Sequence, residues 1–187
     1  MFSFDQESHT YTLDGAILPS VTTLLKECGI ISTAFYTDAG ATNGSRRHLV
    51  TELLDRGNLD WSTVADEDIP YLEAWIKAKE DLSIEIEEIE KPMHHSIYGY
   101  AGMVDRLCTI GEENWVIDIK TGAKAKWNEL QMILYGMMVS DFYSVSFPKM
   151  AIFNLKKNGR YEFSEVTYAQ KNVAIAAVMI QKYKESK

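Results

Sequence analysis

The sequence predicts a mixed α/β fold in which a sheet is flanked by helices. Four apolar stretches, each bounded by turn-forming residues, are typical of strands. They cover residues 98–109, 115–119, 147–154 and 161–166. Segments with helical spacing of apolar side chains lie between and beyond them. With 187 residues and 46% hydrophobic content, the chain is long enough to bury a sizeable core, so a single domain over residues 1–187 is expected.

The first third of the chain is predicted to hold a small hairpin and two helices. Residues 2–18 suit the hairpin, because turn-forming residues divide its apolar stretches. Ser20 suits the N-cap of a short helix that ends at Gly29. Residues 30–43 show no regular pattern, and a second helix is expected over residues 43–54.

The remaining helices and strands follow in alternation. A helix is expected from Asp68 to Leu82, and a strand over residues 83–89. Strands 98–109 and 115–119 are joined by a short turn, so they should form an antiparallel hairpin. A helix over residues 126–140 comes next. After the last two strands, Thr167 is expected to cap a terminal helix.

Charged side chains interrupt the two strands of the central hairpin. Asp118 and Lys120 share one face of their strand, because side chains alternate, while Ile117 and Ile119 share the other. Alone, an Asp-x-Lys pattern more often indicates a solvated surface pair. Asp105, however, interrupts an otherwise apolar strand, and a buried carboxylate there needs a partner or a metal ion.

Two carboxylates and a lysine suit the hydrolysis of a phosphodiester. Mg²⁺ prefers carboxylate oxygens, and it neutralises the phosphate and acidifies a bound water. Asp105 and Asp118 match the ligand count, and the carbonyl of Ile119 offers a further oxygen. Lys120 would bring a compact positive charge to the attacking water or the phosphate.

Two further elements have both a structural and a functional interpretation. Gln131 and Tyr135 lie four residues apart on the helix after the hairpin, which is ordinary amphipathic spacing or a polar pair facing the site. His48 lies on the predicted helix over residues 43–54. A single histidine on a helix is more often structural than a ligand, so its local sequence alone favours the structural interpretation.

Taken together, these elements resemble the PD-(D/E)xK nuclease superfamily in its RecB-like exonuclease branch. The resemblance covers roughly residues 16 to 140, and its motifs occur in the order of that branch. They are Pro19–Leu25, Gly44–His48, Glu90–Pro92, Gly102–Asp105, Asp118–Thr121 and Gln131–Tyr135. The first of them resembles the opening of phage-type and mitochondrial single-strand exonucleases.

The resemblance implies a restriction-endonuclease-like core and a role for each matching residue. His48, Asp105, Asp118 and the Ile119 carbonyl would bind Mg²⁺ or Mn²⁺, and Lys120 would be catalytic. Glu90 would support these ligands or bind a second metal ion, and Gln131 and Tyr135 would support the site or contact DNA. Some members hold an iron–sulfur cluster on four cysteines. This chain has only Cys28 and Cys108, so no such cluster is expected.

The net charge of −8 argues mildly against a nucleic-acid partner. The local distribution points the other way, because basic residues surround the proposed site while the acidic excess lies elsewhere. Arg46, Arg47, Lys124 and Lys126 are the expected DNA contacts. The first residues lack the pattern of a signal peptide, and no apolar run is long enough to span a bilayer. Two isolated cysteines suit the reducing cytoplasm.

The function predicted from the sequence is that of a metal-dependent DNA exonuclease in phage or prophage recombination or in DNA processing. A recombination protein or a single-strand-binding protein is an expected partner besides DNA. A structure-specific endonuclease on the same fold, or a DNA-binding module without turnover, are the alternatives. The sequence leaves open the strand polarity, the preference for single or double strands and the oligomeric state.

Overall fold

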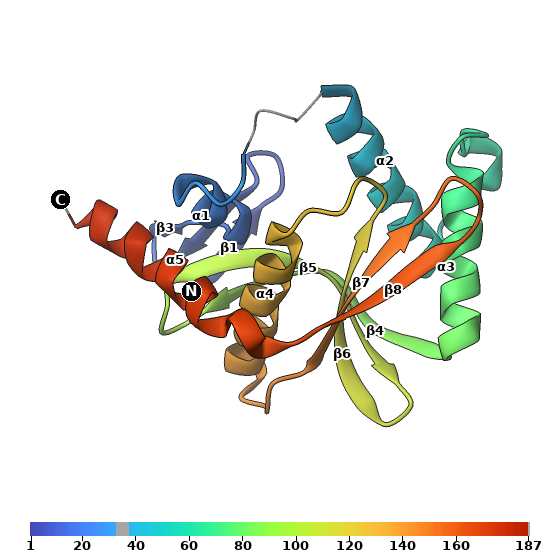
Figure 1. The fold of residues 1–187 in the computed structure, drawn as a ribbon. Helices are drawn as coiled ribbons and strands as arrows, with labels where there is room; N and C mark the ends of the chain where they lie inside the picture. Colours follow the sequence, from blue (N-terminus) through green and yellow to red (C-terminus); the bar gives the residue numbers. More distant parts are fainter. Residues whose placement is uncertain (33–37, 187) are drawn as a thin grey trace.

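The computed structural model describes residues 1–32 and 38–186. A five-stranded sheet lies at its centre (Figure 1). In spatial order its strands are β4 (Ile84–His95), β5 (Tyr100–Ile110), β6 (Glu113–Lys120), β7 (Lys149–Leu155) and β8 (Tyr161–Val166). Only β6 and β7 pair parallel, whereas the other neighbouring strands pair antiparallel. The sheet is therefore mixed, and the predicted hairpin of β5 and β6 is confirmed.

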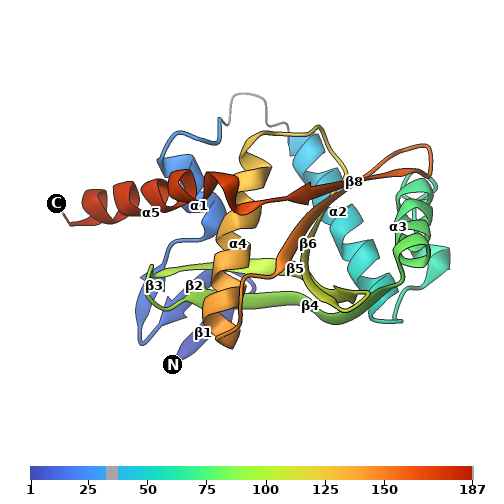
Figure 2. The same cartoon turned by 60° about the horizontal axis from the view of Figure 1, so that its bottom comes forward.

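Helices cover both faces of this sheet. A parallel pair needs a crossover, which α4 (Trp127–Tyr143) provides between β6 and β7. Both views group α4 with α1 (Val21–Glu27) and α5 (Lys171–Glu185), and place α2 (Asp38–Asp55) and α3 (Ile69–Leu82) together elsewhere (Figures 1 and 2). The predicted fold class, a mixed sheet flanked by helices, is confirmed.

The alternation of side chains along β6 explains the two cores. Val116 packs into the cluster that includes α1, α4 and α5. Ile117 and Ile119 point the other way and pack with Trp75 of α3. Asp118 lies between the two isoleucines in the sequence, so alternation turns its side chain toward α4. The sequence assigned these two faces correctly.

The N-terminal segment forms a separate three-stranded sheet. The expected hairpin over residues 2–18 contains β1 (Phe2–Asp5), β2 (Thr10–Leu13) and β3 (Ala16–Leu18), all antiparallel. Ser20 caps α1 as predicted, since its hydroxyl oxygen accepts a hydrogen bond from the backbone amide of Thr23 at 3.0 Å. The carbonyl of Pro19 accepts the amide of Ala101 at 3.0 Å, which ties this segment to β5.

Three predicted boundaries are wrong. Helix α2 begins at Asp38 and not at residue 43, while residues 33–37 lie outside the described part of the chain. β4 continues to His95 and does not stop at residue 89. It passes through Pro92, which an edge strand tolerates because one side of its ladder is unpaired. Thr167 makes no capping hydrogen bond, and a short 3₁₀ turn, η3 (Tyr168–Gln170), precedes α5.

The other helical segments agree with expectation. The predicted helix from Asp68 to Leu82 is α3, with Asp68 as the residue before its first turn. A 3₁₀ turn, η2 (Trp61–Thr63), lies between α2 and α3. Within the described ranges, none of the helices has both the length and the apolar character that crossing a bilayer requires.

Candidate metal and nuclease site

Three carboxylates meet where β4, β5 and β6 lie side by side. The register of β4 and β5 places Glu90 opposite Asp105. β5 and β6 pair as far as Arg106 and Ile117, so the next residues level with each other are Asp105 and Asp118. Residues opposite each other on neighbouring strands have Cβ atoms about 4.5–5.5 Å apart. The sheet thus gathers three acidic side chains from three consecutive strands.

Asp105 lies at the centre of this group and is held by the backbone. Its Oδ2 accepts the amide of Ile119 at 2.9 Å, where the ladder between β5 and β6 has ended. His48 Nδ1, from α2, lies 3.4 Å from the same oxygen. One ligand atom each from His48, Glu90 and Asp105 lies within 4.8 Å of the others. Nitrogen and carboxylate donors at this spacing fit a single divalent cation.

Asp118 and Lys120 form an ion pair beside that group. Lys120 Nζ lies 2.9 Å and 2.8 Å from the two carboxylate oxygens of Asp118. Asp118 is 1% exposed, and burial raises its pKa to about 6, with Lys120 opposing and Asp105 adding to the rise. Asp118 lies outside the group of three possible ligands, so its predicted role as a ligand stays a prediction. Ile119 contacts Asp105 through its amide, and its carbonyl as a ligand is likewise still a prediction.

Glu90 has an unusual backbone and an unusual proton affinity. Its φ of 47° lies in the left-handed region, which non-glycine residues rarely adopt and which often marks functional sites. Burial, and then the charge of Asp105, raises its pKa to about 8, while Arg106 opposes the rise. Such crowding of carboxylates is relieved when a cation binds between them.

Gln131 and Tyr135 of α4 are buried next to the acidic group. Gln131 Nε2 donates to the hydroxyl of Tyr135 at 3.1 Å. Burial, and then the charge of Asp118, raises the pKa of Tyr135 well above its usual value. A Cβ atom at Gly102 would lie 2.8 Å from Tyr135 Cε1. The glycine of one motif therefore makes room for the tyrosine of another.

Arg46 and Arg47 are engaged with acidic side chains. Both guanidinium groups pair with Asp68 at the start of α3, and Arg46 also contacts Glu67. Arg47 lies over the ring of Tyr71 at 4.0 Å from its centroid. These contacts tie α2 to α3, so the two arginines have a structural explanation, and their predicted contact with DNA is an untested expectation.

The lysines after β6 are more accessible. Lys124 pairs with Glu162 of β8 at 2.9 Å, and about half of each side chain is exposed. Lys126 is exposed directly before α4. Exposed pairs of this kind break at little cost, so both ammonium groups remain suited to a phosphate backbone.

A pocket of about 450 Å³ leads to the acidic group. It is lined by Gly44, Ser45, His48, Leu49, Glu52 and Glu90. Two of the three possible metal ligands therefore face this opening, and the third, Asp105, is 8% exposed behind them. The pocket therefore opens the acidic group to solvent from the side of α2.

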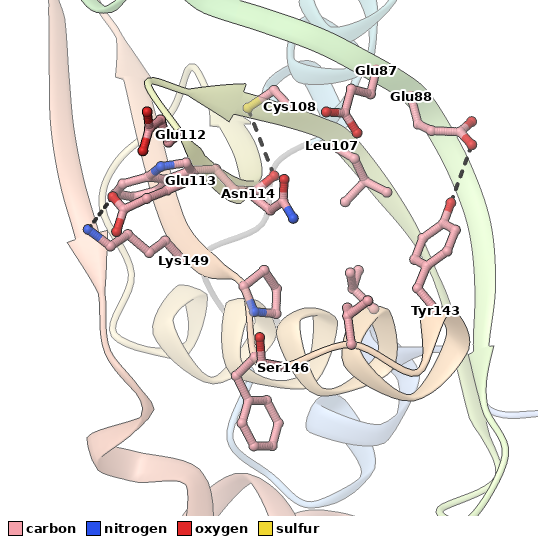
Figure 3. Close-up of a pocket in the computed structure, with 15 residues that line it drawn as sticks. Glu87, Glu88, Leu107, Cys108, Glu112, Glu113, Asn114, Tyr143, Ser146 and Lys149 are labelled. Carbon is pink, nitrogen blue, oxygen red and sulfur yellow. Dashed lines mark hydrogen bonds and ion pairs between the residues drawn. The ribbon is translucent and has the colours of Figure 1, made fainter.

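A larger pocket, of about 690 Å³, lies at the opposite end of β6 and β7 (Figure 3). Lys149 and Asn114, at the beginnings of these strands, are part of its lining. Its wall carries the glutamates Glu87, Glu88, Glu112 and Glu113. Figure 3 shows Tyr143 of α4 reaching across to Glu88, whose Oε1 accepts its hydroxyl at 3.3 Å. An acidic wall repels a phosphate backbone, so this pocket is not part of the candidate site.

Two buried polar residues near the site were missed from the sequence. Arg106 is 0% exposed and contacts Glu90, although it directly follows Asp105 in an apolar strand. Asn154 of β7 is 2% exposed and pairs in register with Lys120. Both residues could have been found from the sequence, because each is a polar residue within a strand of mostly apolar residues. Asp55, which pairs with Arg106, lies 51 residues away in the sequence.

No protein-family model and no curated protein matches this chain. Among solved structures, one neighbour is a candidate exonuclease from Eubacterium rectale, with a TM-score of 0.52 and 10% identity, covering 87% of this chain and 71% of that chain. Another is an alkaline exonuclease from Laribacter hongkongensis, with a TM-score of 0.46 and 12% identity, covering 89% of this chain and 87% of that chain. The first likeness shows a shared fold, in agreement with the restriction-endonuclease-like core expected from the sequence.

Proposed function

We propose that this protein is a Mg²⁺- or Mn²⁺-dependent DNA exonuclease of the PD-(D/E)xK superfamily. The observation that carries the proposal is the meeting of His48, Glu90 and Asp105 within 4.8 Å, beside the ion pair of Asp118 and Lys120. The fold shared with the protein from Eubacterium rectale supports it. The order of the sequence motifs favours the RecB-like exonuclease branch, with a cytoplasmic role in phage recombination or DNA processing.

In this proposal the protein holds its metal ligands ready before substrate arrives. His48, Glu90 and Asp105 would hold the ion, with Asp118 next to them. When bound, a divalent ion supplies charge neutralisation at the phosphate and a more acidic water. The amide of Ile119 fixes Oδ2 of Asp105, so this carboxylate needs little rearrangement to act as a ligand.

Lys120 would act on the phosphate. Asp118 holds its ammonium at the end of β6, with 21% of the lysine side chain exposed. A fixed positive charge at that place stabilises the charge that develops during attack on phosphorus. The hydroxyl of Tyr135 stays protonated because its pKa is well raised. Since it accepts from Gln131, its proton can be donated to an acceptor such as a phosphate oxygen.

End-labelled linear DNA and covalently closed circular DNA, each digested with Mg²⁺ or with Mn²⁺, test the proposal. An exonuclease releases nucleotides from the linear substrate, leaves the circle intact, and stops when EDTA is added. Cleavage of the circle would instead indicate an endonuclease on this fold. Binding without cleavage of either substrate would indicate a DNA-binding module. Asp118→Asn, prepared in parallel, excludes a contaminating nuclease.

The choice of metal ion provides a further test. Imidazole suits transition ions better than Mg²⁺, so Mn²⁺ should support activity at least as well as Mg²⁺. In a crystal structure with Mn²⁺ bound, His48 should lie at a bonding distance of about 2.0–2.3 Å. A bound Mn²⁺ that His48 does not contact would contradict this assignment.

A further inference from the structure

Arg106 is a buried cation behind the candidate metal site. Its side chain is 0% exposed, and burying a guanidinium group is costly unless its partners are well placed. Nε donates to Asp55 Oδ2 at 2.7 Å, and Nη1 contacts Glu90 Oε1 at 3.2 Å. Nη1 also donates to the carbonyl of Asp105 at 2.7 Å. One rigid group therefore joins the end of α2 to two residues of the site.

Asp55 is already well satisfied without Arg106. Its carboxylate, which is fully buried, accepts the indole N–H of Trp75 at 3.0 Å and 2.9 Å. Lys79 of α3 also pairs with it. Asp55 is thus a fixed anchor, and its charge already has an opposite charge next to it. A second cation is not required to neutralise it.

The arginine is also not optimal for stability. Within the described part of the chain, its Nη2 is buried without a hydrogen-bond partner, and an unsatisfied buried donor costs stability. The planar guanidinium group directs two arms at once, however, which a lysine ammonium does not. One arm reaches the anchor Asp55, and the other reaches Glu90.

Glu90 needs such a restraint. Its backbone is in the left-handed region, and its carboxylate lies within 4.8 Å of a carboxylate oxygen of Asp105 and lines a pocket together with Glu52. Arg106 contacts one oxygen of this carboxylate from inside the protein at 3.2 Å, whereas the pocket on its other side is lined by Glu52 and His48. The contact with Arg106 keeps it beside Asp105.

We propose that Arg106 is a positioning residue, which uses Asp55 as its anchor to aim the carboxylate of Glu90 at the cation shared with His48 and Asp105. This inference rests on the metal site within the proposed function, because it requires that these residues bind a divalent cation, whether or not the protein cuts DNA. Partners that orient metal ligands commonly change the affinity for the metal by about 10- to 100-fold when they are removed. Arg106 should therefore affect metal affinity as well as stability.

Calorimetric titration of the full chain with Mn²⁺, in the absence of DNA, tests this inference. Arg106→Lys keeps the positive charge but loses the planar group that contacts Asp55 and Glu90 at once. The dissociation constant of this variant for Mn²⁺ should therefore rise by about tenfold or more. Lys79→Met is the matched control, because it also removes a partner of Asp55 but does not touch Glu90. The control should lower the melting temperature and leave the dissociation constant within about twofold of the wild type.

A double-mutant cycle shows whether Arg106 acts through Glu90. In a Glu90→Gln background, Arg106→Lys should weaken Mn²⁺ binding much less than it does in the wild type. If Arg106→Lys fails to fold, Asp55→Asn replaces it in the cycle, because it loosens the anchor and leaves the arginine in place. Asp55→Asn should also raise the dissociation constant for Mn²⁺.

The outcomes separate this inference from the proposed function. Equal Mn²⁺ affinity of wild type and a folded Arg106→Lys variant would overturn the inference alone, as would equal effects of Arg106→Lys in both backgrounds. Absence of Mn²⁺ binding by the wild type would overturn the inference together with the proposed function. If the wild type binds Mn²⁺ with the predicted dependence on Arg106 but cuts no DNA, the inference holds and the proposed function fails.

Discussion

Asp55 and Asp118 are both carboxylates with almost no exposure, and their surroundings differ in one respect. Asp55 has three donors around it, from Trp75, Lys79 and Arg106. Among the described residues, Asp118 pairs with Lys120, and the carboxylates of Asp105 and of Glu90, which also contacts Arg106, belong to the same group. The cluster around Asp55 is electrostatically complete, whereas the cluster around Asp118 contains more negative charge than its own cations neutralise.

The difference shows how a structural and a functional acidic cluster can be told apart. In the site, burial and neighbouring carboxylates raise the pKa of Asp118 to about 6 and that of Glu90 to about 8. Carboxylates with raised pKa values concentrate at functional sites, and binding of a cation between them would favour their ionised forms. The contacts of Asp55 tie α2 to α3 and β5, whereas the carboxylates around Asp118 are the candidate metal site.

The largest effect is expected from removing charge in the site. Asp118→Asn should leave the fold intact and abolish hydrolysis, because an amide does not provide the negative charge that the metal and Lys120 require. Circular dichroism and a digestion assay at saturating Mg²⁺ measure both properties. Turnover like that of the wild type in the purified variant would refute the assignment of this cluster.

Lys120 should affect turnover more than binding. Lys120→Ala should lower the cleavage rate at saturating DNA by about 10²–10³, the effect of losing one preorganised charge-stabilising donor. Its DNA affinity should fall only modestly. Lys124→Ala is the control, and it should weaken binding and its salt dependence while saturated turnover stays nearly normal. A wild-type rate for Lys120→Ala would make Lys120 only a binding residue.

In the cluster around Asp55, removal of the carboxylate should affect the stability of the fold. Asp55→Ala leaves Arg106 buried without its anchor, so the free energy of unfolding should drop by about 3–5 kcal/mol. Lys77→Ala removes an exposed pair with Asp81 and should cost far less, because solvent screens exposed pairs. Urea unfolding of both variants gives the comparison. A loss below about 1 kcal/mol for Asp55→Ala would contradict the structural role of this cluster.

The last prediction is a dependence of stability on pH in the metal-free protein. The pKa of Glu90, about 8, lies above its ordinary value of 4.5. Between about pH 5 and pH 8 the folded chain therefore binds more protons at this group than the unfolded chain does. The free energy of unfolding should thus fall as the pH rises through this window. Urea unfolding in EDTA at several pH values measures the slope, and Glu90→Gln should flatten it. An equal slope in the variant would exclude Glu90 as its source.

Local patterns were sufficient to predict the hairpin of β5 and β6 and the positions of Asp105, Asp118 and Lys120. Each of these charged residues interrupts an apolar alternation that can be read within ten residues. The sequence also predicted the mixed sheet, because the strands and helices alternate. The start of α2 and the end of β4 were predicted wrongly. Pro92 marked an end to β4 in the sequence, but the strand continues through it because β4 lies at the edge of the sheet.

Distant pairings could not be read from the sequence. Arg106 lies 51 residues from Asp55, and nothing near either residue indicates their contact. In the same way, the local sequence of Arg46 predicted a contact with DNA, which stays a prediction, and did not indicate its pairing with Asp68, 22 residues further along the chain. A sequence shows the sign of a charge, whereas the fold decides whether that charge is already neutralised.

The close contact between Gly102 and Tyr135 constrains how this chain can change. A Cβ atom at position 102 would lie 2.8 Å from the tyrosine ring, so a larger residue there requires a smaller one at position 135. Among divergent homologues the two positions should therefore vary together or not at all. Such a coupled pair would help to detect related chains whose overall identity is too low for an alignment to be trusted.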